Sequence, residues 1–335
     1  MTAGLVGSGR LARISPPDFP PRLLGLGAAQ PGEKVSGAEL GKRFGKDAEW
    51  IEVRTGIRSV YRIADASPEA QVDEIFEIGR AAGSMALKRS GLEGADIDLV
   101  LTASCSVNVA ITSRIASMLA PSAGWAAINS ACSGFGYALS SAQSLISTGS
   151  ARRVLVVAIE HMSSLLDPDD LGTSIIFGDG AGAAVVGCGT THDVGIGPVV
   201  WGSDGERREH IECDAQGKLV MAGREVFRWA VESVPGIALE ACDRAGVHIS
   251  DIDVFVPHQA NVRIIDAVVS KLGLSDATVA RDIAESGNTS AASIPIALTR
   301  LLANDPTMSG RLGLLVGFGA GMAYAAQVVR LPQTS

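Results

Sequence analysis

Residues Trp125 to Ile146 read W-A-A-I-N-S-A-C-S-G-F-G-Y-A-L-S-S-A-Q-S-L-I, and the hydrophobic period changes at Cys132. The first part, Trp125 to Ala131, is apolar with few turn formers and predicts a buried strand. After Cys132 the apolar residues recur every three or four positions, which is the spacing of one helix face: Phe135, Leu139, Ala142 and Ile146. Cys132 is therefore expected where a strand turns into a helix.

The position of Cys132 allows two interpretations. A thiol at a helix start faces unpaired N–H groups and the positive end of the helix dipole, and both favour the thiolate. The same N–H groups could hold the oxyanion of a carbonyl that the sulfur attacks. Alternatively, Cys132 is a small buried residue that packs a strand end, as free cysteines often do. The stretch alone leaves both interpretations open.

Composition narrows the class of protein. The 335 residues are 47% hydrophobic and 19% charged, so the chain can bury a large core as two domains or as one fused unit. A net charge of −8 argues against nucleic-acid binding. Five cysteines without a C-x-x-C pair argue against a disulfide framework and against a zinc site. The sequence shows neither a signal peptide nor an apolar run that could span a membrane, so a cytoplasmic setting is expected.

Strand and helix patterns alternate along the chain, which predicts a layered α/β fold. Ser67 and Pro68 mark a helix start, and Gly91 marks its end. Pro235 is expected to kink or break a helix over residues 225–244. Both halves end in a glycine-rich apolar strand, residues 178–187 and 317–329, which suggests a duplication of roughly 150 residues. We expect a loosely ordered extension (1–21), a half that carries Cys132 (22–190) and a second half (191–335).

Three residues form a candidate nucleophile set. His258 follows the predicted strand 253–256, and Asn288 stands at a predicted helix start. A cysteine with a distant histidine and asparagine is a known arrangement for acyl transfer. The alternative is that three unrelated polar residues cap their elements, which fits Asn288 well because asparagine is a favoured N-cap.

A second cluster contains Trp50, Arg54 and Arg58. Stacking and ion pairing would make it a clamp for a planar ligand that bears phosphate. A tryptophan that anchors a helix to the core explains the same residues equally well.

Five segments together resemble the β-ketoacyl-acyl-carrier-protein synthase III family. They keep the order of that family over most of the chain: Trp50 to Ile57, Asn129 to Phe135 (NSACSGF), Ile176 to Ala183 (IFGDGAGA), Val256 to Asn261 (VPHQAN) and Gly287 to Pro295 (GNTSAASIP). The resemblance implies a thiolase-like fold of two pseudo-duplicated halves in an α-β-α-β-α arrangement, and a homodimer.

The resemblance also implies a reaction. Cys132 would accept the acyl group of an acyl-coenzyme A, and a malonyl thioester on acyl carrier protein would then lose CO₂ and attack the acyl-Cys132. His258 and Asn288 would donate hydrogen bonds to the enolate oxygen, and the backbone N–H groups of Cys132 and Ala320 would hold the acyl carbonyl. The product would start a fatty acid or prime a polyketide. No metal and no cofactor is implied, since coenzyme A enters as part of the substrate.

The resemblance places further residues around the substrate. Asn108 would lie at the acyl pocket. Seven residues would line the coenzyme A channel: Trp50, Arg54, Arg224, Phe227, Ala260, Asn261 and Arg263. Leu171 stands where the family often has an arginine.

Two other functions fit the same fold. A plain acyltransferase would pass the acyl group from Cys132 to another acceptor without condensation, but it would not need Asn288. A non-catalytic partner subunit of a synthase would not need the intact set of Cys132, His258 and Asn288.

Overall fold

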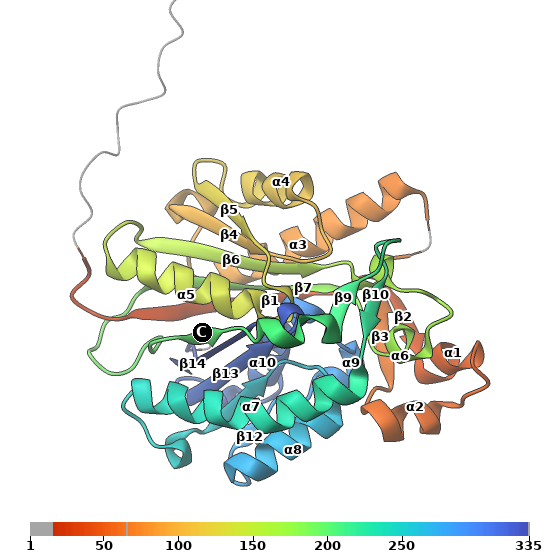
Figure 1. Ribbon diagram of the computed structural model, residues 1–335. Helices are drawn as coiled ribbons and strands as arrows, with labels where there is room; N and C mark the ends of the chain where they lie inside the picture. The colour runs from red at the N-terminus through yellow and green to blue at the C-terminus, as the bar shows by residue number, and fades with distance from the viewer. Residues whose placement is uncertain (1–15, 65, 334–335) are drawn as a thin grey trace, which may run out of the picture.

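Two five-stranded sheets form the centre of the computed structural model, which describes residues 16–64 and 66–333. The strand orders are β1-β7-β6-β4-β5 and β12-β11-β13-β14-β8 (Figure 1). The first sheet contains β1 (Pro21–Ala29), β4 (Leu99–Ala103), β5 (Gly124–Ile128), β6 (Arg153–Glu160) and β7 (Gly180–Cys188). The second contains β8 (Val200–Gly202), β11 (Val254–Pro257), β12 (Thr278–Val279), β13 (Leu312–Phe318) and β14 (Tyr324–Arg330).

The two sheets repeat one pairing pattern. In the first, β5, β4 and β6 are parallel neighbours, and β7 and β1 follow in antiparallel pairs. In the second, β12, β11 and β13 are parallel, and β14 and β8 follow in antiparallel pairs. The predicted duplication is therefore present in the topology of the sheets.

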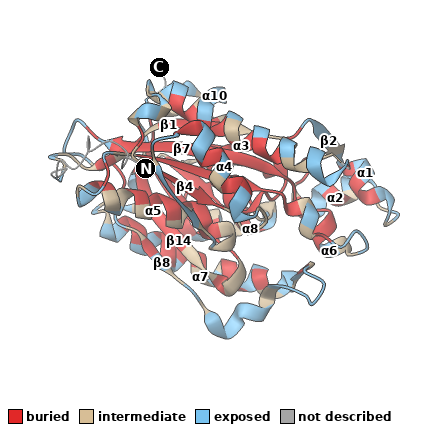
Figure 2. Cartoon of the chain, turned by 90° about the horizontal axis from the view of Figure 1, so that it is seen from above, coloured by how far each residue is buried: buried red, intermediate tan, exposed pale blue. Residues whose placement is uncertain are grey.

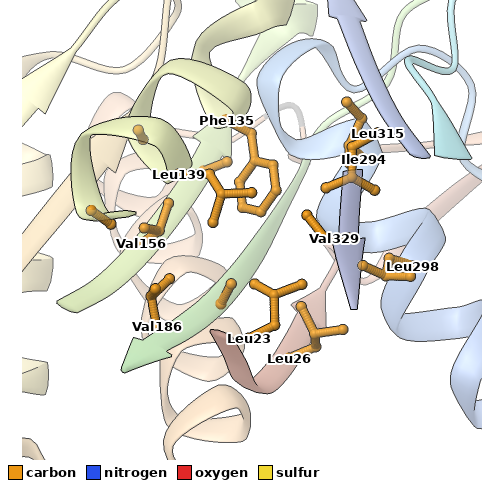
Figure 3. Close-up of a cluster of buried hydrophobic side chains, with 14 of the residues drawn as sticks. Leu23, Leu26, Phe135, Leu139, Val156, Val186, Ile294, Leu298, Leu315 and Val329 are labelled. Carbon is orange, nitrogen blue, oxygen red and sulfur yellow. The ribbon is translucent and has the colours of Figure 1, made fainter. Parts of the chain in front are cut away.

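Helices fill three layers around the two sheets. Helices α5 (Gly134–Ser147) and α10 (Ser293–Asn304) lie between the sheets and contribute Phe135, Leu139, Ile294 and Leu298 to one apolar cluster (Figure 3). Helices α3 (Pro68–Ser90) and α4 (Val109–Leu119) cover the outer face of the first sheet. Helices α7 (Gly223–Arg244) and α8 (Val262–Leu272) cover the second. The predicted α-β-α-β-α order is confirmed, and Figure 2 shows the buried strands between helices whose outer faces are exposed.

Local sequence signals fix the ends of the outer helices. Ser67 accepts the N–H of Ala70 at the start of α3, and Gly91 ends the helix at a φ of 68°. Helix α8 ends at Gly273, which has a φ of 66°. Helix α7 runs through Pro235 from Gly223 to Arg244, so the alternative that Pro235 breaks the helix is wrong.

The strand before Cys132 differs from its prediction. Strand β5 ends at Ile128, and its residues 124–127 are exposed, with Trp125 at 44%. An apolar run fits a buried strand or a strand at an open edge, and β5 is an edge strand of its sheet. The predicted burial is therefore wrong for the isolated chain.

Strand β1 was not indicated by the sequence. Of the predicted extension 1–21, residues 1–15 lie outside the described part, and Pro21 already begins β1. Glycines let β1 approach α3 closely, because a Cβ on Gly27 would fall 2.0 Å from the carbonyl oxygen of Ala82.

Short elements surround the two sheets. They are β2 (Glu33–Ser36), α1 (Gly37–Lys42), α2 (Ala48–Thr55), β3 (Ser59–Arg62), α6 (Leu171–Ser174), β9 (Ile211–Cys213), β10 (Leu219–Met221) and α9 (Ile283–Ser286). Within residues 16–64 and 66–333, no helix combines the length and the apolar character needed to cross a bilayer.

Candidate active site

One cavity of about 710 Å³ is lined by all three residues of the candidate nucleophile set, Cys132, His258 and Asn288. Cys132 comes from the start of α5 in the first half, and His258 and Asn288 come from loops of the second half. All three line the cavity, although more than 120 residues separate Cys132 from His258. The interpretation of three unrelated capping residues is therefore wrong.

A strained backbone projects Cys132 into this cavity. Between β5 and α5 the chain forms a 3-10 turn, Ala131–Ser133, in which Ala131 has a φ of 46°. The turn is held by Asn129, whose Oδ1 accepts the Ala131 N–H at 3.2 Å, and by Ser133, whose hydroxyl donates to the Ser130 carbonyl at 2.7 Å. Left-handed backbone at a non-glycine residue is rare and gathers at functional sites. The predicted position of Cys132 at a turn into a helix is confirmed.

Opposing effects act on the pKa of the Cys132 thiol. Burial raises the pKa of Cys132 to about 12, and the negative charge of Glu160 adds to this effect. A hydrogen bond from Ser290 and the backbone N–H of Cys132 itself lower the pKa but do not offset the burial. The backbone N–H thus favours the thiolate in the predicted direction, but burial outweighs it, so the free thiol is protonated at neutral pH.

The turn after β13 lies directly against Cys132. A Cβ on Gly319 would fall 2.7 Å from the backbone nitrogen of Cys132, so only glycine fits there. The Gly319 N–H donates to the carbonyl of Ala323 at 2.9 Å, and Ala320 begins the next 3-10 turn, Ala320–Met322. N–H groups in the first turn of a helix have no acceptor within that helix. The backbone N–H groups of Cys132 and Ala320 thus remain our prediction for the oxyanion site.

His258 is neutral and fixed in orientation. Its backbone N–H donates to the carbonyl of Val316 at 2.7 Å, and its ring packs edge-on against Phe318 at 5.4 Å. Burial lowers the pKa of His258 to about 3. Its Nδ1 lies 2.7 Å from the hydroxyl of Ser293, and the N–H of Gln259 points at that hydroxyl oxygen at 3.4 Å. If the Ser293 hydroxyl donates to Nδ1, the ring proton is on Nε2, which is the form that can donate to a substrate oxygen.

Hydrogen bonds to residues of nearby loops, and not a position at a helix start, fix the place of Asn288. Its backbone forms hydrogen bonds with Ile176 at 2.9 Å and Gly178 at 3.1 Å, and its Oδ1 accepts the N–H of Ser290 at 2.9 Å. The amide nitrogen, Nδ2, therefore remains to donate into the cavity. Helix α10 begins only at Ser293, so Asn288 is not its N-cap, and that interpretation of Asn288 is wrong.

Most residues predicted for the coenzyme A channel share this cavity. Its lining includes Arg54, Arg224, Phe227, Ala260, Asn261 and Arg263. Trp50 lines an adjoining pocket of about 430 Å³, which also includes Arg54 and Arg263. The Arg54 guanidinium stacks over the Trp50 ring at 4.2 Å, and the Lys46 ammonium lies 4.9 Å from it. Trp50 therefore already packs against two cationic side chains of its own chain. Leu171 belongs to the apolar cluster that surrounds Trp50.

Asn108 is placed elsewhere. It is exposed and caps α4, with its Oδ1 accepting the N–H groups of Ala110 at 3.0 Å and Ile111 at 3.1 Å. Because this local role holds the side chain at the start of the helix, Asn108 does not line the cavity of its own chain.

The sequence analysis missed several residues of the cavity. Cys105 and Cys213, which the sequence did not single out, both line it, as do residues of the β9–β10 hairpin. Cys105 follows β4 by two residues, and β4 and β6 are parallel neighbours, so their carboxyl ends meet at one edge of the sheet. That strand-end position is the signal that could have identified Cys105.

Metal chemistry has no evident site in the described ranges. Within residues 16–64 and 66–333, no three side chains of His, Cys, Asp or Glu gather in a way that could hold an ion.

Two family descriptions match the chain. The C-terminal region of 3-oxoacyl-[acyl-carrier-protein] synthase III matches residues 242–331, and the synthase III description itself matches residues 127–205. The first match contains His258 and Asn288, and the second contains Cys132.

Similar proteins extend the match over nearly the whole chain. A β-ketoacyl-[acyl-carrier-protein] synthase III of Streptomyces lividans is 42% identical over 332 residues, covering 93% of this chain and 94% of its own. The crystal structure of a priming β-ketosynthase from the R1128 polyketide pathway has a TM-score of 0.89 and 40% identity, and the match covers 97% of this chain and 100% of that one. The 3-oxoacyl-(acyl carrier protein) synthase III of Pseudomonas aeruginosa PAO1 has a TM-score of 0.86 and 33% identity, with 94% and 99% covered. With its Cys132, His258 and Asn288 gathered in one cavity, the chain belongs to the β-ketoacyl-acyl-carrier-protein synthase III family of condensing enzymes.

Proposed function

We propose that the protein transfers an acyl group from acyl-coenzyme A to Cys132 and condenses it with malonyl-acyl-carrier protein, with release of CO₂. One observation supports this reaction above all. His258 is bonded at Nδ1 and Asn288 at Oδ1, and both line the cavity of Cys132. With Ser293 donating to Nδ1, each of them has an N–H donor left for a substrate oxygen. Two neutral donors suit an oxygen that becomes negative during the reaction.

In the first half-reaction the Cys132 sulfur attacks the thioester carbonyl. The C–S bond to coenzyme A breaks, the coenzyme A sulfur leaves with the electron pair, and the acyl group stays on Cys132. The oxygen becomes negative in the tetrahedral intermediate, where the backbone N–H groups of Cys132 and Ala320 would hold it.

In the second half-reaction the malonyl thioester loses its carboxylate as CO₂. The electron pair of the broken C–C bond forms an enolate, whose oxygen would be held by His258 and Asn288. The enolate carbon attacks the acyl-Cys132 carbonyl, and the Cys132 sulfur leaves. No base has to remove a proton from carbon, because decarboxylation supplies the carbanion, and for this reason we propose neither a metal nor a resident cofactor.

Cationic side chains support a phosphate-bearing substrate at the mouth of the cavity. Arg224 and Arg263 are exposed, and Arg54 lines the same opening. Guanidinium groups bind phosphate through paired hydrogen bonds. Coenzyme A and the phosphopantetheine group of acyl carrier protein both carry phosphate at the end remote from the thioester, so the two substrates can use one entrance in turn. We propose a role in fatty-acid initiation or polyketide priming, and the similar R1128 enzyme is a priming ketosynthase of a polyketide pathway.

We further propose a homodimer that works in the cytoplasm. The edge strand β5 exposes Trp125 at 44%, and the adjacent helix α4 exposes Val109 at 58% and Met118 at 59%. Large apolar side chains gathered at an open sheet edge are typical of an interface. The five free cysteines in the described chain are compatible with a reducing compartment.

The decisive experiment separates the two half-reactions. Intact-protein mass spectrometry with acyl-coenzyme A should show one acyl adduct, and peptide mapping should place it on Cys132. Asn288→Ala should form this adduct at nearly the normal rate but lose CO₂ release by about 10²- to 10³-fold, because it removes one donor to the enolate oxygen. The CO₂ is measured from a labelled malonyl thioester in a single turnover.

Asn304→Ala is the matched control, since it makes the same change on the exposed last turn of α10. It should leave both half-reactions unchanged. Normal CO₂ release by Asn288→Ala would contradict the proposed enolate site. If the wild type forms the adduct but condenses with no malonyl thioester, the protein is instead an acyltransferase.

A further inference from the structure

A fully buried carboxylate lies behind the nucleophile and has no part in the reaction described so far. Glu160 ends β6 and is 0% exposed. Its oxygens accept the hydroxyl of Ser104 at 3.1 Å and the backbone N–H groups of Cys105 at 3.2 Å, Ser106 at 3.1 Å and Ala291 at 3.3 Å. The Ser106 hydroxyl also donates to it. So many donors on one carboxyl group suit the ionised form, which can only accept.

Ser290 connects this carboxylate with the nucleophile. Ser290 lines the same cavity as Cys132, and the next residue, Ala291, donates its backbone N–H to Glu160 at 3.3 Å. Burial raises the pKa of both Cys132 and Glu160, and the Ser290 hydroxyl acts on both groups in the opposite direction. Ser290 is itself fully buried, with a left-handed φ of 48° in the turn before α10. Ala131 has the corresponding place in the turn before α5, with a φ of 46°. The duplicated fold therefore brings two strained turns together, and one of them supplies the hydroxyl.

Cys105 completes the cluster. Its Sγ lies 3.4 Å from Oε1 of Glu160 and 3.4 Å from the hydroxyl of Ser290. A carboxylate cannot donate, so the hydrogen of Cys105 points at Glu160, and the Ser290 hydroxyl is free to turn toward either sulfur. Cys105 and Cys132 are the titratable groups that face Glu160. Burial raises the pKa of both thiols, and the charge of Glu160 raises it further.

The acyl-transfer step requires an acceptor for the proton of Cys132. His258 is unsuited, because its buried ring resists a second proton and its Nδ1 is already bonded to Ser293. A thiolate formed beside an ionised Glu160 would place two negative charges in one desolvated cluster. If the proton moves to Glu160, the cluster keeps one negative charge throughout and only its position changes.

We propose that Glu160 is a positioning residue for acyl transfer, which takes the proton of Cys132 through the hydroxyl of Ser290. The inference deepens the proposed function and rests on it. The S–H bond of Cys132 breaks, Ser290 receives that proton and passes its own to an oxygen of Glu160, and the sulfur forms its bond to the acyl carbon. The coenzyme A thiolate that leaves takes a proton back along the same route, so protons and electrons balance.

The variant Glu160→Gln distinguishes this role from a structural one by the direction of the change. If Glu160 only supplies a fixed charge, its removal lowers the pKa of Cys132 and speeds acylation at neutral pH. If it accepts the proton, its removal slows acylation at pH 7 by about 10²-fold. The rate of the variant should then rise roughly tenfold per pH unit as hydroxide forms the thiolate, and should overtake the wild type at alkaline pH.

The measurement is the rate of acyl-Cys132 formation between about pH 6 and pH 10, followed by rapid-quench mass spectrometry with peptide mapping. Crossing pH profiles support the proposal. A variant that is faster at pH 7, or slower by one constant factor at every pH, overturns it. Ser290→Ala should give the same slow, pH-dependent profile, and a normal rate at pH 7 in that variant would also contradict the relay.

Two controls keep the result separate from misfolding and from the proposed function. Ser144→Ala makes the same serine-to-alanine change at an exposed position of α5, so it should acylate within about threefold of the wild type at pH 7. Glu160→Gln acylated beforehand at alkaline pH should release CO₂ from a malonyl thioester at nearly the normal rate. If the wild type acylates but never releases CO₂, the proposed condensation is wrong. The pH profiles of acylation would still test the role of Glu160.

Discussion

Single residues determine the state of the oxyanion donors. The Ser293 hydroxyl is placed to fix the tautomer of His258, because its oxygen lies 2.7 Å from Nδ1 and already faces the N–H of Gln259. A buried imidazole without this partner could place its proton on Nδ1 and leave a lone pair facing the substrate oxygen. The catalytic competence of His258 thus depends on a side chain at the start of α10.

We expect Ser293→Ala to slow CO₂ release by about tenfold, which corresponds to the loss of roughly 1.4 kcal/mol of hydrogen bonding in the transition state. Acylation of Cys132 should remain nearly normal. Ser293→Thr keeps a hydroxyl and should retain most of the rate. Nitrogen NMR of labelled histidine reads the tautomer directly, and a proton that stays on Nε2 in Ser293→Ala would show that Ser293 does not set it.

The close approach of strand β1 to helix α3 depends on glycines, which have no side chain. Strand β1 packs on α3, and a Cβ on Gly27 would meet the Ala82 carbonyl oxygen at 2.0 Å and the Ala86 nitrogen at 2.7 Å. Both atoms belong to helix backbone, so neither can move without shifting α3. The strand, which the sequence did not indicate, thus depends on two glycines, Gly25 and Gly27.

Gly27→Ala should lower the free energy of unfolding by about 1–3 kcal/mol, the usual cost of overpacking. Gly32→Ala is the matched control, because no atom lies within 4 Å of a Cβ at that position. It should change the free energy by less than about 0.5 kcal/mol. Urea titrations followed by circular dichroism measure both variants, and equal midpoints would refute the steric explanation.

The whole molecule has an uncovered apolar edge. Strand β5 and helix α4 expose Trp125, Val109 and Met118, whereas the other four strands of the same sheet are largely buried. β5 also leads into the turn that carries Cys132. An interface at this edge would therefore support the active site from outside.

The proposed dimer predicts a mass near twice 34.5 kDa in light scattering. Val109→Glu combined with Met118→Glu should shift the protein toward one chain, because charges would be buried in the interface. Leu239→Glu alters another exposed apolar residue, 46% exposed on α7, and should leave the mass unchanged. A wild type that runs as a single chain would contradict the dimer.

The sequence by itself determined the features that depend on neighbouring residues, such as helix caps, and on the spacing of hydrophobic residues. The helix from Ser67 to Gly91 follows from its capping residues, and the α/β layers follow from alternating strand and helix patterns. Cys132, His258 and Asn288 could be identified because each lies in a segment with a distinctive order of residues. Asn108 was placed at the acyl pocket by the resemblance alone, and within one chain its side chain caps α4.

Only the tertiary structure decided the properties that arise from segments far apart in the chain. Glu160, Cys105 and Ser290 meet because the carboxyl ends of β4 and β6 lie against the turn before α10. The protonation of Cys132 follows from its burial and from the charge of Glu160, and neither is visible in the residues beside it in sequence. The exposure of β5 follows from its place at the edge of the sheet. Local sequence sets backbone geometry, whereas desolvation and charge depend on what the fold packs around a group.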